Sequence, residues 1–273
     1  MSRFTAAVKY SSLVAVCVAL LLPLVTMVFA AFKTGPEYSS TSAFTPPRDW
    51  LNFANFQRAF SEGDMLRGTA NTALVLLVSI AGTILLGTAA AYAIDRFDFR
   101  FKKAVLALFL VASLIPSVTT QVSVFQIVNS LGLFNTRGAA VVLFVGTDIV
   151  AIYVFLQFLA AIPRSIDEAA RLDGAGHFRI YWLVILPLLR PAIATVVIIK
   201  AVAVYNEFYV PFLYMPSPRL AVISTSLFRF KSQYSADWEV ISAGVILVTI
   251  PALVTFLALQ RVIYRGLAAG AVK

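Results

Sequence analysis

The chain has 273 residues, of which 60% are hydrophobic and 13% are charged, and its mean hydropathy is +0.87. A soluble domain carries roughly 25% charged and about 45–50% apolar residues, so this composition excludes an ordinary soluble domain and predicts a polytopic membrane protein. The net charge of +9, which would suggest nucleic acid in a soluble protein, is here expected to come from basic cytoplasmic loops.

Six apolar runs are long enough to cross a bilayer, at about residues 10–32, 69–94, 104–128, 138–162, 188–208 and 240–262. Inside a bilayer each backbone group must be satisfied within its own segment, so we expect an all-α polytopic protein with six transmembrane helices. The first run exceeds the ~7–15 residues of a signal peptide core, which predicts a retained span. The alternative is cleavage by signal peptidase after the Ala30-Ala31 pair that precedes Phe32.

The orientation follows from the short turn DRFDFRFKK, residues 95–103, between the second and third runs. Lys and Arg concentrate in cytoplasmic loops, so this turn predicts that both termini and segment 163–187 are cytoplasmic. Segments 33–67 and 209–239 are then outside loops, the first with a short amphipathic helix near Phe53–Phe60. No G-x-x-x-x-G-K-[ST] nucleotide signature occurs, so any energy must come from another chain or from an ion gradient.

A charged insert, IPRSIDEAARLDGAGHF at residues 162–178, separates the fourth and fifth runs. Pro163 ends the preceding span, and the S-x-x-E pattern of Ser165 and Glu168 predicts a capping box at the start of a short helix. Gly174 is expected to end that helix. A helix of about two turns is marginal alone in water, so it either packs on a partner or lies as a solvated connector on the lipid surface.

Polar groups inside the spans are candidates for a substrate pathway, with polar contacts between helices as the alternative. A lone charge at mid-bilayer costs ~2.5–3.5 kcal/mol, and Asp148 and Lys200 lie at similar depths in neighbouring spans. They are expected either to form an ion pair or to meet separate polar groups. Pro116 is expected to kink the third span, which carries a polar stripe. The pathway candidates are Gln121, Gln126, Asp148, Lys200, Asn206 and Glu207.

The stretch EAARLDGAGHFRIYWLVILP resembles the EAA loop of ABC-importer permeases, E-A-A-x₃-G-x₉-I-x-L-P. The matching residues are Glu168, Ala169, Ala170, Gly174, Leu186 and Pro187, whereas Val184 replaces the isoleucine. The resemblance extends to the smaller permease subunit of maltose-type carbohydrate importers. Three further motifs support this resemblance: GLFNT at 132–136, YNEF at 205–208 (W-N-E-F in the family) and the tail QRVIYRGLAAGAVK at 260–273. The resemblance therefore covers essentially the whole chain.

This resemblance implies a type I ABC importer transmembrane-domain fold, with residues 1–273 as one permease domain and a coupling loop at 163–187. It implies a permease subunit of an ATP-driven sugar importer, which forms half of the translocation pathway and works by alternating access. The implied residues that couple to the ATPase are Glu168, Ala169, Ala170, Leu172, Asp173 and Gly174. The implied tail contacts to the ATPase are Gly266, Gly270 and Lys273.

The same resemblance implies the partners and the location. The partners are a second, different permease, two ATPase subunits and an extracytoplasmic solute-binding protein or lipoprotein. ATP and Mg would be bound by the ATPase, and no cofactor by this chain, which would not itself be an enzyme. The location is the inner membrane of a bacterial or archaeal cell. The particular sugar does not follow from the sequence.

Three other functions compete with a sugar permease. One is a permease of the same wider family for glycerol-3-phosphate or a polyol, and the cationic Lys200 favours the phosphorylated substrate of the two. A second is an ion-coupled secondary carrier, which would work without an ATPase. The third is an intramembrane enzyme, which no nucleophile–base constellation supports. One cysteine, Cys17, and one histidine, His177, also exclude a His/Cys zinc site.

Overall fold

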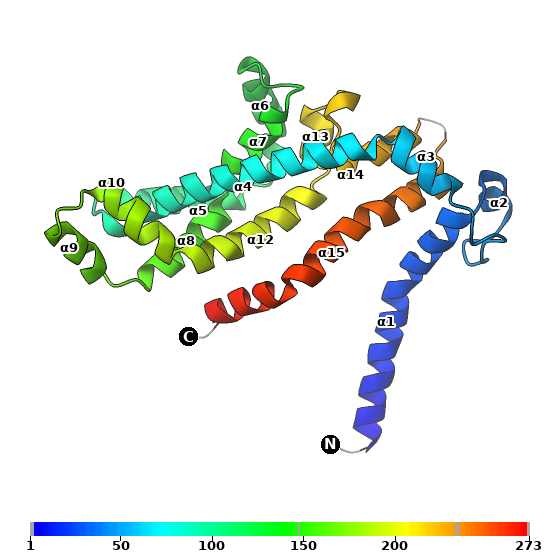
Figure 1. The fold of residues 1–273 in the computed structure, drawn as a ribbon, viewed down its shortest axis with the longest axis horizontal. Coiled ribbons are helices and arrows are strands. Elements are labelled where there is room, and N and C mark those ends of the chain that lie inside the picture. The colour runs from blue at the N-terminus through cyan, green and yellow to red at the C-terminus, as the bar shows by residue number, and fades with distance from the viewer. Residues whose placement is uncertain (1–2, 147, 233–234, 272–273) are drawn as a thin grey trace. The chain divides into compact units, whose positions relative to one another are not determined.

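A computed structural model describes residues 3–146, 148–232 and 235–271. Over these residues the chain is mainly helical. It forms an isolated antiparallel β-bridge, between Lys231 and Ala236. The chain divides into two compact units, residues 1–68 with 225–255 and residues 69–224 with 256–273. Figure 1 shows the helices in chain order by colour.

The first unit contains α1 (Arg3–Phe32), α2 (Gly35–Ser40), α3 (Ala54–Glu62), η3 (Leu227–Phe230) and most of α15 (Trp238–Ala271). Helix α3 confirms the short helix expected near Phe53–Phe60. The ring of Phe32 packs against Trp50, Phe53 and Phe56, with centroids 5.1–5.7 Å apart. The segment after α1 is therefore held by an aromatic cluster.

Two polar contacts also order the first unit. Lys33 is buried, and its ammonium donates to Thr41 Oγ1 at 3.0 Å and to the carbonyl of Ser42 at 2.9 Å. The Arg58 guanidinium donates to Asp237 Oδ2 at 3.0 Å, and this hydrogen bond raises the pKa of Arg58. The predicted outside loop 33–67 is thus an ordered part of the first unit and does not form a domain of its own.

The second unit holds the remaining elements. They are α4 (Met65–Arg96, whose first turn belongs to the first unit), α5 (Lys102–Leu114), α6 (Ser117–Ser130), α7 (Arg137–Gly146), α8 (Ile149–Ala160), α9 (Ser165–Leu172), α10 (His177–Ile180), the π-helical turn η1 (Tyr181–Ile185), α11 (Leu186–Leu188), α12 (Arg190–Asn206), α13 (Tyr209–Tyr214), η2 (Pro218–Leu220) and α14 (Ile223–Ser226, whose last two residues belong to the first unit).

Three helices in the described residues are long and apolar enough to cross a membrane: α1 from Val8, α4, and α15 as far as Leu257. Three further spans arise only if bent pairs of helices are counted as one each, with bends of 107° between α5 and α6, 42° between α7 and α8, and 71° before α12. The first bend lies at Pro116, where the sequence predicts a kink. Six spans are consistent with this architecture, and their boundaries in a bilayer stay a prediction.

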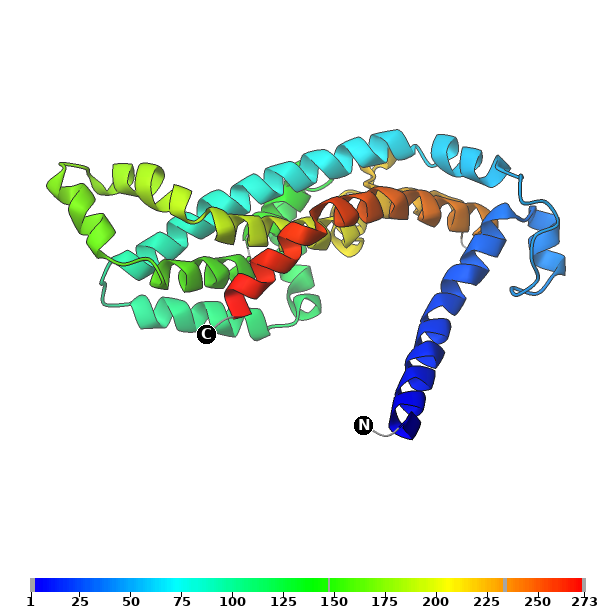
Figure 2. The ribbon, with the colours of Figure 1, turned by 60° about the horizontal axis from the view of Figure 1, so that its bottom comes forward.

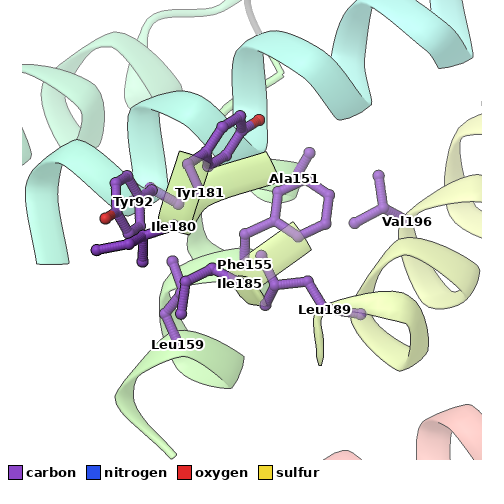
Figure 3. Close-up of a cluster of buried hydrophobic side chains, with 11 residues drawn as sticks. Tyr92, Ala151, Phe155, Leu159, Ile180, Tyr181, Ile185, Leu189 and Val196 are labelled. Carbon is purple, nitrogen blue, oxygen red and sulfur yellow. The ribbon is translucent and has the colours of Figure 1, made fainter. Parts of the chain in front are cut away.

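The core of the second unit joins α4, α8, α10, η1 and α12. Figure 3 shows Tyr92, Phe155, Ile180, Ile185 and Val196 converging from these elements. Phe155, Ile180 and Ile185 have no exposed surface. The Tyr181 hydroxyl lies 2.7 Å from Thr88 Oγ1 on α4. The short helices that follow α8 are therefore anchored to α4 and α8 by one apolar cluster.

Helices α4 and α7 approach closely at Gly82. A Cβ added there would lie 2.7 Å from Val145 Cγ2, a distance that real Cβ atoms essentially never show. We predict that Gly82→Ala costs about 1–3 kcal/mol by overpacking, measured as thermal unfolding in detergent. Gly146→Ala is the matched control, because nothing lies within 4 Å of its added Cβ. Val145→Ala should restore the stability of Gly82→Ala, and equal losses in the two glycine variants would contradict the packing explanation.

Candidate coupling site and membrane ion pair

Helix α9 carries the sequence-predicted coupling residues, and its start differs from the prediction. The capping box is wrong: the helix already begins at Ser165, and Arg164 at the N-cap makes no side-chain capping bond. The N–H of Ile166 bonds the carbonyl of Pro163, and the N–H of Glu168 bonds that of Arg164 at 3.1 Å. These backbone carbonyls already accept hydrogen bonds from the first N–H groups of the helix, and the helix begins one residue earlier than predicted. The Ser165 hydroxyl therefore does not cap it.

The end of α9 agrees with the prediction. Gly174 has φ +81°, the left-handed region in which glycine is preferred. The N–H of Ala175 bonds the carbonyl of Ala170 at 3.0 Å, and the N–H of Gly174 bonds that of Arg171 at 2.9 Å. These two bonds form a Schellman motif, which satisfies the last carbonyls of the helix.

The predicted coupling residues form one exposed surface at this end of the second unit. Glu168, Ala169, Leu172, Asp173 and Gly174 are exposed, with Leu172 at 90%. Ala170 differs, because it is partly buried and packs against the apolar core cluster. In Figures 1 and 2, α9 and α10 form a short helical hairpin beyond α8. An exposed leucine beside a small alanine is a surface that another protein can cover.

Sequence reasoning missed the role of Asp167. Its side chain is only 4% exposed, and its Oδ2 lies 3.0 Å from Nε of Arg96, whose side chain is also 4% exposed. One feature of the sequence could have indicated its orientation. Asp167 precedes Ala170 by three residues, which places both on one helix face. Since Ala170 faces the core, Asp167 had to face inward as well.

The interrupted helix α7–α8 builds a second polar site. The Lys200 ammonium on α12 lies 2.6 Å from Asp148 Oδ2 and also donates to the carbonyl of Phe144 in α7. Asp148 caps α8, since its Oδ1 accepts from the N–H of Ala151 at 3.0 Å. The expected ion pair is therefore present. Each charge also faces the helix end that suits it, the cation a C-terminus and the carboxylate an N-terminus.

The other pathway candidates lie apart from this pair. Gln121 is partly exposed and Gln126 exposed on α6. Asn206 donates to the carbonyl of Val202 in its own helix. Glu207 Oε1 accepts from the N–H groups of Tyr209 and Val210, so it holds the start of α13. The structure does not gather the six candidates into one site.

A groove of about 280 Å³ lies between α5 and α8, lined by Leu110, Ser113, Ile149, Val150, Tyr153, Val154 and Gln157. None of the six pathway candidates lines it. Its walls are mainly apolar, with the Tyr153 hydroxyl turned to the carbonyl of Leu106 at 3.3 Å. No group of three His, Cys, Asp or Glu residues that could hold a metal occurs in the described part of the chain.

The predicted tail contacts fall at the end of the chain. Gly266 and Gly270 lie in α15. Lys273 lies outside the described residues. Their contact to an ATPase stays a prediction.

Comparison with known proteins places this geometry in a family. Residues 83–269 match the model of the binding-protein-dependent transport system inner membrane component, and the chain belongs to that family. The match includes the whole of α9 and both members of the membrane ion pair. The family is that of ABC transporter permeases, which are membrane subunits with several apolar helices.

Named relatives extend over nearly the whole chain. The melibiose/raffinose/stachyose import permease MelC of Bacillus subtilis is 29% identical, covering 92% of this chain and 91% of its own. The maltodextrin transport permease MalD of Streptococcus pneumoniae is 29% identical, covering 98% and 95%. The galactooligosaccharides transport permease GanQ of Bacillus subtilis is also 29% identical, covering 97% and 94%.

Solved structures share the fold. A chain of a bacterial ABC transporter that imports the acidic polysaccharide alginate superposes with a TM-score of 0.81 at 18% identity, covering 96% of this chain and 98% of that one. The alginate transporter in complex with its pentasaccharide-bound periplasmic protein gives 0.67 at 18% identity, covering 95% of both. The all-α fold is therefore that of an ABC importer transmembrane subunit.

Proposed function

We propose that this chain is one permease subunit of an ATP-driven importer for a sugar or oligosaccharide. The observation that carries the proposal is α9, a capped and exposed helix whose residues match the EAA loop inside the family-matched region. The sugar class rests on the relatives, which are permeases for melibiose, maltodextrin and galactooligosaccharides.

In the proposed mechanism α9 seats in a groove of a cytoplasmic ATPase, with both termini of the chain on the same side. The ATPase binds ATP and Mg and carries out hydrolysis, and this chain has no catalytic role. Nucleotide binding draws the ATPase pair together, which displaces α9 and favours one of two membrane conformations. A second permease completes the pathway, and a solute-binding protein delivers the substrate from outside.

The contacts of Lys200 reduce the case for a phosphorylated substrate. An unpaired cation in the membrane favours glycerol-3-phosphate, but Asp148 neutralises this one at 2.6 Å, and the Phe144 carbonyl accepts a further hydrogen bond from it. A neutral sugar or polyol needs no such charge. An ion-coupled secondary carrier is disfavoured by the family membership.

Affinity purification of the chain from native membranes, followed by mass spectrometry, tests the function. We expect an ATPase subunit, a second permease and a sugar-binding protein to be recovered with it. The binding protein then identifies the sugar for an uptake assay in liposomes. Uptake by this chain alone in liposomes without ATP would instead establish an ion-coupled carrier or channel.

A further inference from the structure

The junction between α4 and α9 is built around a buried ion pair that the proposed function does not use. Arg96 is the last residue of α4 and Asp167 lies in the first turn of α9. Both side chains are 4% exposed, and Nε and Oδ2 are 3.0 Å apart. Among the described residues, neither oxygen of Asp167 has a hydrogen-bond partner. The buried negative charge is therefore balanced by the guanidinium of Arg96.

Arg96 links three elements at once. Its Nη1 lies 2.7 Å from Asp95 Oδ2, and its Nη2 donates to the carbonyl of Ile162, just beyond α8, at 3.0 Å. Arg164 adds a bond from the loop to the carbonyl of Asp95 at 2.9 Å. A cation at the end of α4 and an anion at the start of α9 also suit the dipoles of both helices.

Helix α9 has little else to hold it. It has eight residues, and an isolated helix of this length does not persist in water. Its apolar contact with the core is made through Ala170, with Ala175 just beyond its end, and both side chains are single methyl groups. Loss of Arg96 leaves the Asp167 carboxylate buried without a counter-charge, which is far more damaging than loss of a surface pair. Loss of Asp167 leaves Arg96 with Asp95 but removes its ionic contact with α9.

Helix α4 extends from this junction to the opposite end of the second unit. There Asn71 Nδ2 donates to the carbonyls of Arg219 and Ala221 at 3.1 and 2.9 Å, and Asn71 Oδ1 accepts from Arg137 at 2.9 Å. The helix between residues 71 and 96 is about 37 Å long at 1.5 Å per residue. A rigid helix of this length would carry a displacement of its Arg96 end to the loops that contact Asn71.

We propose that Arg96 is a positioning residue that fixes the coupling helix to α4 through Asp167, so that α9 and α4 move as one body. The proposal rests on the proposed function, since it assigns the route by which displacement of α9 reaches the membrane helices. Without the ion pair, α9 would still bind an ATPase but would move independently of α4.

Hydrogen exchange of residues 165–172 in the full chain, in detergent, tests the attachment without any partner. Asp167→Asn and Arg96→Gln should each speed exchange of α9 by about tenfold or more, because local opening no longer breaks the pair. The double variant should add nothing further, since both changes remove one interaction. Asp98→Asn is the matched control, because Asp98 is 83% exposed and pairs with Lys102 at 3.6 Å.

The ATPase rate of the purified complex tests the transmission. In Asp167→Asn, which keeps the shape of the side chain, the ATPase should still co-purify, while stimulation by the binding protein falls about tenfold, equivalent to ~1.4 kcal/mol. Unchanged exchange in α9 would overturn the attachment, and full stimulation despite faster exchange would overturn the transmission. If the wild-type chain recovers no ATPase, the proposed function itself fails and the proposal with it.

Discussion

We expect Gly174→Asp to lower coupled uptake strongly while leaving the chain folded and inserted. Position 174 has φ +81°, and nothing lies within 4 Å of an added Cβ, so the strain is in the backbone and not in a clash. L-residues cost roughly 1–2 kcal/mol in this conformation, and aspartate tolerates it better than most. The fold therefore survives, but the new carboxylate projects from the exposed surface of α9 that we propose docks on the ATPase.

The measurement is uptake of the sugar carried by the co-purified binding protein, with a loss of about tenfold or more expected, equivalent to ~1.4 kcal/mol. Gly176→Asp is a matched control. It also has open space at its Cβ, but its φ is −72° and any residue adopts it. If both variants lose uptake equally, a carboxylate anywhere in this loop is responsible and position 174 has no special role in docking. Normal uptake by Gly174→Asp would refute the coupling role.

The second large effect concerns the membrane ion pair. Lys200→Met or Asp148→Asn leaves its partner without a counter-charge, and breaking a buried pair costs about 3–5 kcal/mol. The side chains are 11% and 16% exposed, so little solvent screening reduces this figure. We expect each single variant to lower the thermal stability of the chain in detergent strongly. The double variant should recover most of the loss, because no unpaired charge remains.

A charge reversal separates the pair from its surroundings. With lysine at 148 and aspartate at 200, each charge faces the wrong helix end, since Phe144 presents a carbonyl and α8 its N-terminus. The reversed pair should therefore be less stable than the neutral double variant. Asp237→Asn serves as the control, because its pair with Arg58 is nearly half exposed and a surface pair contributes about 0–1 kcal/mol. Additive losses in the neutral double variant would contradict the pairing.

Composition and local chemistry predicted the helical class and the end of α9. The left-handed Gly174 follows from chain geometry alone, and the depth of Asp148 and Lys200 follows from counting along two spans. The start of α9 was not predictable in the same way. The S-x-x-E pattern predicts a side-chain cap. In the structure, the carbonyls of Pro163 and Arg164 accept hydrogen bonds from the first N–H groups of the helix, and the side-chain cap is not formed.

The sequence also concealed the breaks within the spans. A hydropathy window averages over about 20 residues, so it registers an apolar run whether or not the helix is continuous. Because α7 ends at Gly146 and α8 begins at Ile149, Asp148 caps α8 and Lys200 donates to the carbonyl of Phe144 in the last turn of α7. The ionic partner of Asp167 was equally hidden, because Arg96 lies far earlier in the chain and only folding brings the two side chains together.

The Asp148–Lys200 pair also imposes an order on biosynthesis. The two residues are 52 positions apart, so at 5–20 residues per second Asp148 leaves the ribosome about 3–10 s before its counter-charge. During that interval a carboxylate must either wait in an aqueous or protein-lined site or enter lipid uncompensated. We therefore expect the α7–α8 segment to gain its stable place in the bilayer only when α12 arrives, so that the two segments leave the insertion machinery together.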